Sequence, residues 1–152
     1  DAGVANLAGL KELRELNLCA TPIKGSGLRH LSSLSKLSYL NLWNTEVGDE
    51  GLKHIAKLSG LRHLWLNCPS LIGEEDEDVY ITNNGLKHLA ELTDLRTLAI
   101  RNAHITDEAV DYLKGLSRLQ YLDLTGTQIS SQGVMELYDA FPYCFIIPPT
   151  GR

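Results

Sequence analysis

The leucine spacing of this chain repeats, and that repetition constrains its fold more than any other feature of the sequence. The phrase LxxLxL begins at residues 13, 37, 61, 95 and 119, with isoleucine in its last position at residue 100. Successive starts are separated by 24, 24, 34 and 24 residues. Because alternating apolar residues favour a strand, each phrase predicts one short strand at the same place in a repeated unit.

A second apolar phrase follows each strand phrase, and its spacing is helical. It reads GLKHIAKL in one unit (51–58) and GLKHLAEL in another (85–92). Apolar residues three or four apart lie on one face of a short helix. The same phrase occurs without a strand as GVANLAGL (3–10), so we expect residues 1–12 to be a partial unit. One unit cannot bury its apolar side alone, and neighbouring units are therefore predicted to stack around a shared core. Its central ladder would be Leu16, Leu40, Leu64, Leu98 and Leu122.

The repeated unit resembles the leucine-rich repeat family. It reads LxxLxLxxTxITDxGLxxLxxL and is clearest in LSYLNLWNTEVGDEGLKHIAKL (37–58) and LRTLAIRNAHITDEAVDYLKGL (95–116). Within the family it is similar to bacterial repeats of planctomycete type and to the substrate-binding repeats of F-box proteins. Leucine stands where the latter have a second cysteine column, and no F-box is present. The resemblance implies an α/β solenoid with a parallel β-sheet on its concave face and short helices on its convex face.

We expect residues 1–152 to form a single domain with units starting at 13, 37, 61, 95 and 119. The closing FPYCFIIPP (141–149) resembles the segment that seals such arrays and is expected to be a C-terminal cap. The chain lacks methionine at its start and begins inside a repeat, which suggests a part of a longer protein.

Strand residues that lie between the leucines point away from the core, onto the predicted concave face. Adjacent strands are about 4.8 Å apart, so Tyr39, Trp43, His63 and Trp65 are expected to form one cluster there. Aromatic side chains on an exposed sheet are typical anchors of protein interfaces.

Other residues of the same columns extend this predicted surface. Ala99 next to Trp65 is expected to leave a shallow pocket, and Arg101 and Asp123 are expected to be charged groups at its rim. The predicted partner-binding residues are Tyr39, Trp43, His63, Trp65, Asn67, Arg101, Tyr121 and Asp123.

The irregular step of 34 residues predicts an insertion at about residues 72–81, which contains the acidic run EEDED (74–78). Either Leu71 or Ile81 is expected to take the inward apolar position. The insertion should leave the sheet beside Trp43, Trp65 and Arg101. It could be a solvated excursion, an acidic lip of the concave face, or a calcium loop, although it lacks the DxDxDG spacing of an EF-hand.

Several function classes find no support in the sequence. The net charge of −5 argues against nucleic acid as a partner, and no apolar run is long enough to span a membrane or to suggest membrane contact. No catalytic motif, cofactor motif or metal-ligand set is present, and the column His30, His54 and His88 is explained by repeat copying. The carboxylates of Asp49, Asp107 and Glu108 open predicted helices, where they favour the positive end of the helix dipole.

Together these features predict a non-catalytic module that binds a protein or peptide through its concave face. Two alternatives remain: the substrate-recognition part of a ubiquitin-ligase-like adaptor, and a purely structural spacer in a larger protein. The three cysteines form no CxxC pair, and the compartment stays open.

Overall fold

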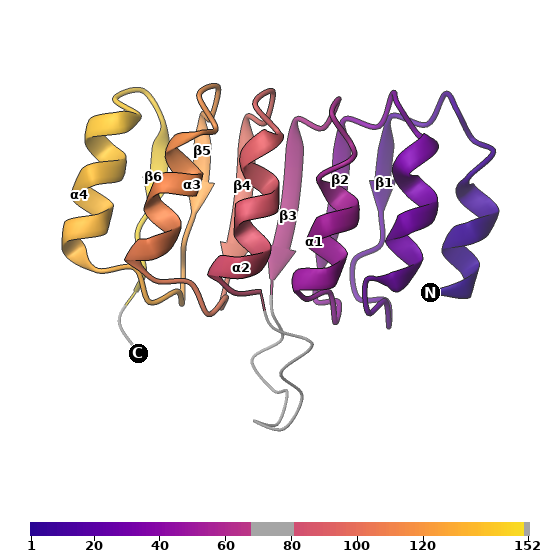
Figure 1. Ribbon diagram of the computed structural model, residues 1–152, viewed down its shortest axis with the longest axis horizontal. Coiled ribbons are helices and arrows are strands. Elements are labelled where there is room, and N and C mark those ends of the chain that lie inside the picture. Colours follow the sequence, from indigo (N-terminus) through magenta and orange to yellow (C-terminus); the bar gives the residue numbers. More distant parts are fainter. Residues whose placement is uncertain (68–80, 151–152) are drawn as a thin grey trace.

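A computed structural model describes residues 1–67 and 81–150 of the chain, as strands and short helices in alternation (Figure 1). The strands are β1 (Glu15–Asn17), β2 (Tyr39–Trp43), β3 (His63–Asn67), β4 (Thr97–Arg101), β5 (Tyr121–Asp123) and β6 (Phe145–Ile147). The α-helices are α1 (Asp49–Ile55), α2 (Asn83–Leu86), α3 (Val110–Lys114) and α4 (Ser131–Ala140). The 3-10 helices are η1 (Ala2–Leu7), η2 (Ser26–Ser33), η4 (Lys87–Glu91) and η5 (Asp107–Ala109).

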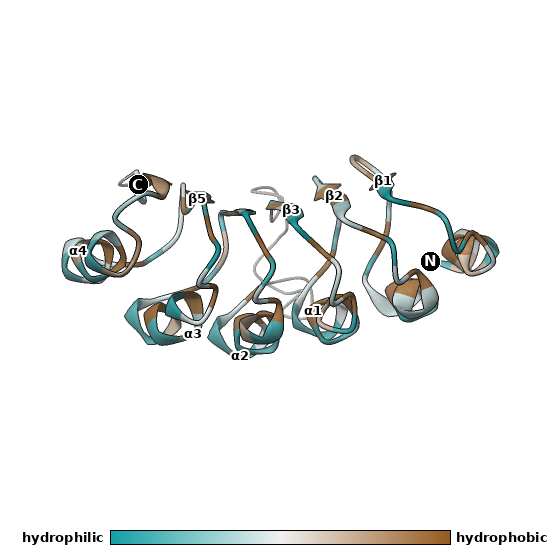
Figure 2. Cartoon of the chain, turned by 90° about the horizontal axis from the view of Figure 1, so that it is seen from above, coloured by the Kyte–Doolittle hydropathy of each residue, from teal (hydrophilic) through white to brown (hydrophobic). Residues whose placement is uncertain are grey.

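The strands form one parallel sheet in the order β1-β2-β3-β4-β5-β6, and the helices form a second layer on one face of it. Seen from above, the row of helices is longer than the row of strands and bows outward, with apolar sides turned toward the sheet (Figure 2). The sheet therefore lines the concave side and the helices the convex side. Every strand pairing among the described residues is parallel, so the predicted α/β solenoid is confirmed.

The strand register is the same at every step along the array. Leu40 pairs with Leu64 across β2 and β3, and Leu64 pairs with Leu98 across β3 and β4, although the second step along the chain is ten residues longer. Of the two residues predicted to fill the inward position, Ile81 is 1% exposed and its carbonyl accepts a hydrogen bond from the backbone N–H of His104. Leu71 and the predicted acidic insertion lie outside the described residues, apart from Ile81 at its end.

The predicted leucine ladder is present, with one exception at its first rung. Leu40, Leu64, Leu98 and Leu122 have no exposed surface. Leu16 is only partly buried, so the prediction that it lies fully inside the core is wrong. It belongs to β1, the first strand of the sheet, and has a neighbouring strand on one side only.

Carboxylates at the starts of helices connect neighbouring units. Asp49 at the start of α1 accepts hydrogen bonds from the backbone N–H and hydroxyl of Thr82, at 2.8 and 2.6 Å. Asp107 accepts the same pair from Ser130, at 2.7 and 2.6 Å. We call this arrangement the carboxylate clamp. The sequence placed both residues at helix starts but did not predict that each carboxylate reaches into the next unit.

Glycine at the third helical position makes room for the carboxylate clamp. A Cβ atom at Gly85 would collide with the carboxylate of Asp49, and one at Gly133 would collide with that of Asp107. Glycine at these two positions is therefore explained by the close approach of a carboxylate from the preceding unit.

The last unit ends in β6, which pairs with β5 in the same parallel register. Phe141 and Ile146 are each 6% exposed and belong to the core. Cys144 packs against this core, and burial raises the pKa of its thiol to about 11.

Candidate functional site

All eight predicted site residues lie on four neighbouring strands of the concave face. Tyr39 and Trp43 are in β2; His63, Trp65 and Asn67 are in β3; Arg101 is in β4; Tyr121 and Asp123 are in β5. Strand alternation directs the leucines between them into the core, so these side chains share the opposite face. Seven of the eight are half-buried, and Asp123 is fully buried.

The aromatic side chains do not form the single cluster that the sequence predicted. Tyr39 contacts His63, with ring centroids 6.3 Å apart. Trp65 instead contacts Tyr121 of β5, with ring centroids 5.8 Å apart. Trp43 contacts the guanidinium of Arg101, whose carbon lies 4.9 Å from the ring centroid. Within the described part of the chain, Tyr39 and His63 contact each other, whereas Trp43 and Trp65 each contact a residue outside the predicted cluster.

A small residue explains the direction of Trp65. Ala99 is its register partner in β4 and has no side chain beyond Cβ, so the indole can extend over β4 to reach β5. Ala99 has no exposed surface. The shallow pocket predicted at Ala99 is therefore wrong.

Phe145 belongs to this surface and was missed by the sequence reasoning. It is 64% exposed and stacks on Tyr121, with ring centroids 5.9 Å apart and planes inclined by 23°. Trp65, Tyr121 and Phe145 thus form a row of aromatic rings from β3 to β6, which we call the aromatic row. The sequence signal for Phe145 is the continuation of the strand columns into FII (145–147), where Phe145 is the register partner of Tyr121.

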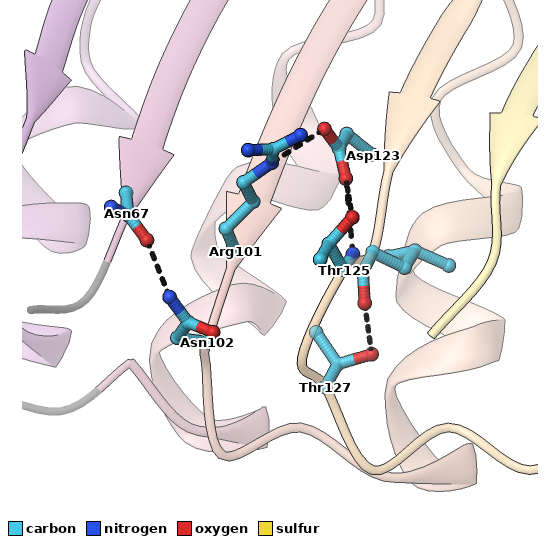
Figure 3. Close-up of polar contacts among 7 residues, drawn as sticks. Asn67, Arg101, Asn102, Asp123, Thr125 and Thr127 are labelled. Carbon is cyan, nitrogen blue, oxygen red and sulfur yellow. Dashed lines mark hydrogen bonds and ion pairs between the residues drawn. The ribbon is translucent and has the colours of Figure 1, made fainter. Parts of the chain in front are cut away.

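Arg101 and Asp123 form a polar network with Thr125, as Figure 3 shows. The Arg101 Nε donates a hydrogen bond to Asp123 Oδ2 at 2.7 Å. The other carboxylate oxygen accepts from the backbone N–H and hydroxyl of Thr125, at 3.0 and 2.6 Å. Asp123 is 1% exposed, so the prediction that it is a charged rim group is wrong.

The position of Asp123 follows from the repeat. Asn17 and Asn41 occupy the same column in earlier units, and each accepts a hydrogen bond from the backbone N–H two residues later. Asp123 makes the equivalent bond to Thr125, and its second oxygen is thereby left for Arg101. An acidic residue in an amide position is the sequence signal for this network.

Hydrogen bonds also determine the charge state of Asp123. Burial by itself would raise the pKa of the carboxyl, but the bonds from Thr125 and Arg101 outweigh burial and hold the pKa below its usual value. Asp123 is therefore ionised at neutral pH.

The lowered pKa predicts how stability depends on pH. A carboxyl with a lower pKa in the folded state stabilises the fold above its unfolded pKa of about 3.9, and this contribution is lost as the pH falls through the folded value. We expect the free energy of unfolding to fall below about pH 4, and to fall less steeply in Asp123→Asn. Urea denaturation at a series of pH values measures both slopes. Identical slopes in the two proteins would contradict the prediction.

The remaining predicted residues are held by neutral contacts. His63 Nδ1 lies 2.9 Å from the Thr97 hydroxyl, and burial, together with the nearby charges of Arg96 and Arg62, lowers the pKa of the imidazole. His63 is therefore uncharged at neutral pH. Asn67 accepts a hydrogen bond from the side-chain amide of Asn102 at 2.8 Å.

A hollow of about 400 Å³ lies toward the end of the sheet, between Arg96, Arg118 and Tyr143. None of the eight predicted residues lines it. Within the described part of the chain, no helix is long and apolar enough to cross a membrane.

Comparisons with known proteins agree with the repeat architecture. The family model described as Leucine Rich repeat matches residues 33–56 and 117–137. The fold is similar to that of an internalin C2 from Listeria monocytogenes, with 25% sequence identity and a TM-score of 0.71 over 96% of this chain. It is also similar to Leiomodin-1 Actin-Binding Site 2, with 18% identity and a TM-score of 0.69 over 93% of this chain and 87% of that one. The chain spans 65% of the length of the internalin C2 chain. A comparison with curated protein sequences finds no match.

Proposed function

The chain carries leucine-rich repeats and folds as a leucine-rich-repeat solenoid, and from that premise we propose that it is a non-catalytic module that binds a protein or peptide through its concave face. The observation that carries the proposal is the aromatic row, which places half-buried and exposed rings side by side on a sheet. The proposed contact residues are the eight predicted from the sequence together with Phe145, with Asp123 acting indirectly by holding Arg101.

The physical argument concerns the cost of forming an interface. Aromatic rings bury a large area when they are covered, and they lose little side-chain entropy because few torsions define their positions. Here Trp65 and Phe145 both rest against Tyr121, so their positions are restricted before a partner arrives. Ordered aromatic side chains on a sheet that is itself held in one register are suited to act as binding hot spots.

The known proteins of similar fold support the general class. The leiomodin-1 structure is named for an actin-binding site, so a protein of this fold has a protein partner. The identity of that partner is not carried over to this chain, because 18% identity supports a shared fold alone. The non-catalytic part of the proposal rests on the site itself: His63 pairs with a threonine hydroxyl, and Asp123 is occupied by Thr125 and Arg101.

Two further functions are compatible with the same fold. A substrate-recognition part of a ubiquitin-ligase-like adaptor would also use the concave face, and its partner would be ubiquitinated in the presence of the complete ligase. A structural spacer would not need the aromatic row, so its function would tolerate substitutions on the concave and convex faces equally.

Trp65→Ala tests the proposal. We expect it to weaken binding by about 2 kcal/mol or more, or roughly 30-fold, because it removes a central anchor. The fold should survive, since the buried Trp65 Nε1 has no hydrogen-bond partner among the described residues and its loss breaks no such bond. Partners captured from a lysate of the source organism by the wild-type protein would be identified, and the dissociation constants measured by calorimetry.

The matched control is Tyr112→Ala, which truncates an aromatic side chain of α3 on the convex side that is 36% exposed. Binding should be unchanged in this variant. Equal affinities of the wild-type protein and Trp65→Ala would place the contact elsewhere. If the wild-type protein retains no partner more strongly than Trp65→Ala and Tyr112→Ala do, the result would favour the structural spacer.

A further inference from the structure

We propose that Arg101 selects a carboxylate, so that the partner presents an aspartate or glutamate side chain to the concave face next to an apolar residue that covers the aromatic row. This inference rests on the proposed function and adds the chemistry of the partner.

Among the described residues, Arg101 forms a side-chain hydrogen bond through its Nε alone. Its Nε is used by Asp123, and its guanidinium carbon lies 4.9 Å from the centroid of the Trp43 ring. The two terminal amino groups of the guanidinium make no hydrogen bond to the part of the chain that the structure describes. The side chain is 35% exposed, so a ligand can reach it. A planar guanidinium whose terminal donors make no hydrogen bond within residues 1–67 and 81–150 matches the geometry of a carboxylate.

The guanidinium is also ordered before binding. Asp123 is fixed by two hydrogen bonds from Thr125 and in turn holds Nε, while the ring of Trp43 contacts the guanidinium. Ordering a long side chain normally opposes binding by about 0.5–1.5 kcal/mol. Most of that cost is already met in the free protein, so Arg101 can bind a charged group more strongly than a freely rotating arginine could.

Among the described residues, the charges that act on His63 are two arginines, Arg96 and Arg62, and one glutamate, Glu15, so positive charge predominates near this part of the sheet. Arg14, Arg62 and Arg96 are exposed and stand immediately before β1, β3 and β4, and Arg62 and Arg96 are close enough to lower the pKa of His63. Glu15 in β1 is exposed, but the carboxylate of Asp123 is buried and engaged with Arg101. Positive charge on a binding face attracts acidic segments and disfavours basic ones.

A displayed library of random linear peptides provides the test. Peptides would be selected on the wild-type protein and, in parallel, on Arg101→Gln, Trp65→Ala and Arg118→Gln. Arg118→Gln is the matched control. Arg118 is a largely exposed arginine in the loop before β5, and it pairs with Asp94. Circular dichroism would verify that each variant is folded, and Arg101→Met, which also removes the guanidinium but keeps a long side chain, replaces Arg101→Gln if the latter unfolds.

We expect the peptides selected by the wild-type protein and by Arg118→Gln to share an acidic position near an apolar one. That acidic preference should disappear with Arg101→Gln. For one selected peptide, replacing the acidic residue by its amide should weaken binding to the wild-type protein about tenfold or more, since hydrogen bonds to charged groups contribute about 1.5–3 kcal/mol. The same replacement in the peptide should change its affinity for Arg101→Gln by less than about twofold, because this variant already lacks the guanidinium that the acidic residue would contact.

The other outcomes separate this inference from the proposed function. Selected peptides that lose affinity with Trp65→Ala but show no acidic preference would overturn the inference and leave the concave binding site in place. An acidic preference that persists in Arg101→Gln would also overturn it. Two results would overturn both the inference and the proposed function. In one, the library yields no enriched peptides on the wild-type protein; in the other, every enriched peptide binds Trp65→Ala as strongly as the wild-type protein.

Discussion

Replacing Leu64 with alanine is expected to lower the free energy of unfolding by about 2–5 kcal/mol. Leu64 has no exposed surface and lies in β3, near the middle of the leucine ladder, with Leu40 and Leu98 as its register partners. Truncation removes apolar contacts and leaves a cavity that strands on both sides prevent from collapsing. Urea denaturation followed by circular dichroism measures the loss.

Leu16→Ala is the matched control, because it is the same substitution at the same position of a different unit. Leu16 is partly buried in the edge strand β1, so its side chain contributes less and the site can relax. We expect its cost to be clearly smaller than that of Leu64→Ala. Equal costs for both variants would mean that the stability of the array does not follow burial along the ladder.

Asp123→Ala is expected to lower the free energy of unfolding by about 2–3 kcal/mol. The substitution removes the hydrogen bonds from Thr125 and Arg101 and leaves the guanidinium of Arg101 without its ionic partner. The loss should be less than for a fully enclosed ion pair, since the Arg101 side chain is 35% exposed and can be rehydrated. Thermal and urea denaturation at neutral pH measure it.

A second aspartate–arginine pair supplies the control. Asp94 pairs with Arg118, and their side chains are 45% and 65% exposed, so Asp94→Ala should change stability by less than about 1 kcal/mol. The loss of unfolding free energy in Asp123→Asn should lie between the losses in Asp123→Ala and Asp94→Ala, because an amide oxygen can still accept hydrogen bonds from Thr125. A change in Asp123→Ala as small as that in Asp94→Ala would show that the buried network does not stabilise the fold.

The repeat period predicted most of the fold because it acts through one simple constraint. Each unit must direct its strand leucines toward the same core, and this requirement determines the strands, their parallel order and the ladder through Leu40, Leu64, Leu98 and Leu122. The partial burial of Leu16 could not be read from its own unit, since it depends on the lack of a neighbouring strand on one side.

The concave surface was predicted less well, because side-chain direction depends on the sizes of neighbours in other strands. Placing Trp43, His63 and Trp65 on one face was possible from alternation alone. The lean of Trp65 toward Tyr121 requires the small Ala99 between them, and the burial of Asp123 requires Thr125 and Arg101 together. The position of a residue in the repeat predicts where it lies on the sheet, but it does not predict which neighbouring side chains it contacts.

The constant strand register also bears on how such a chain can change during evolution. β2 to β3 and β3 to β4 pair in the same way, although the second connection is ten residues longer, and the clamp from Asp49 to Thr82 holds the far end of that connection in place. The strand register therefore does not depend on the number of residues between Asn67 and Ile81. Closure entropy rises by only about 0.6 kcal/mol for each doubling of loop length, so this junction can gain or lose residues while the concave surface keeps its geometry.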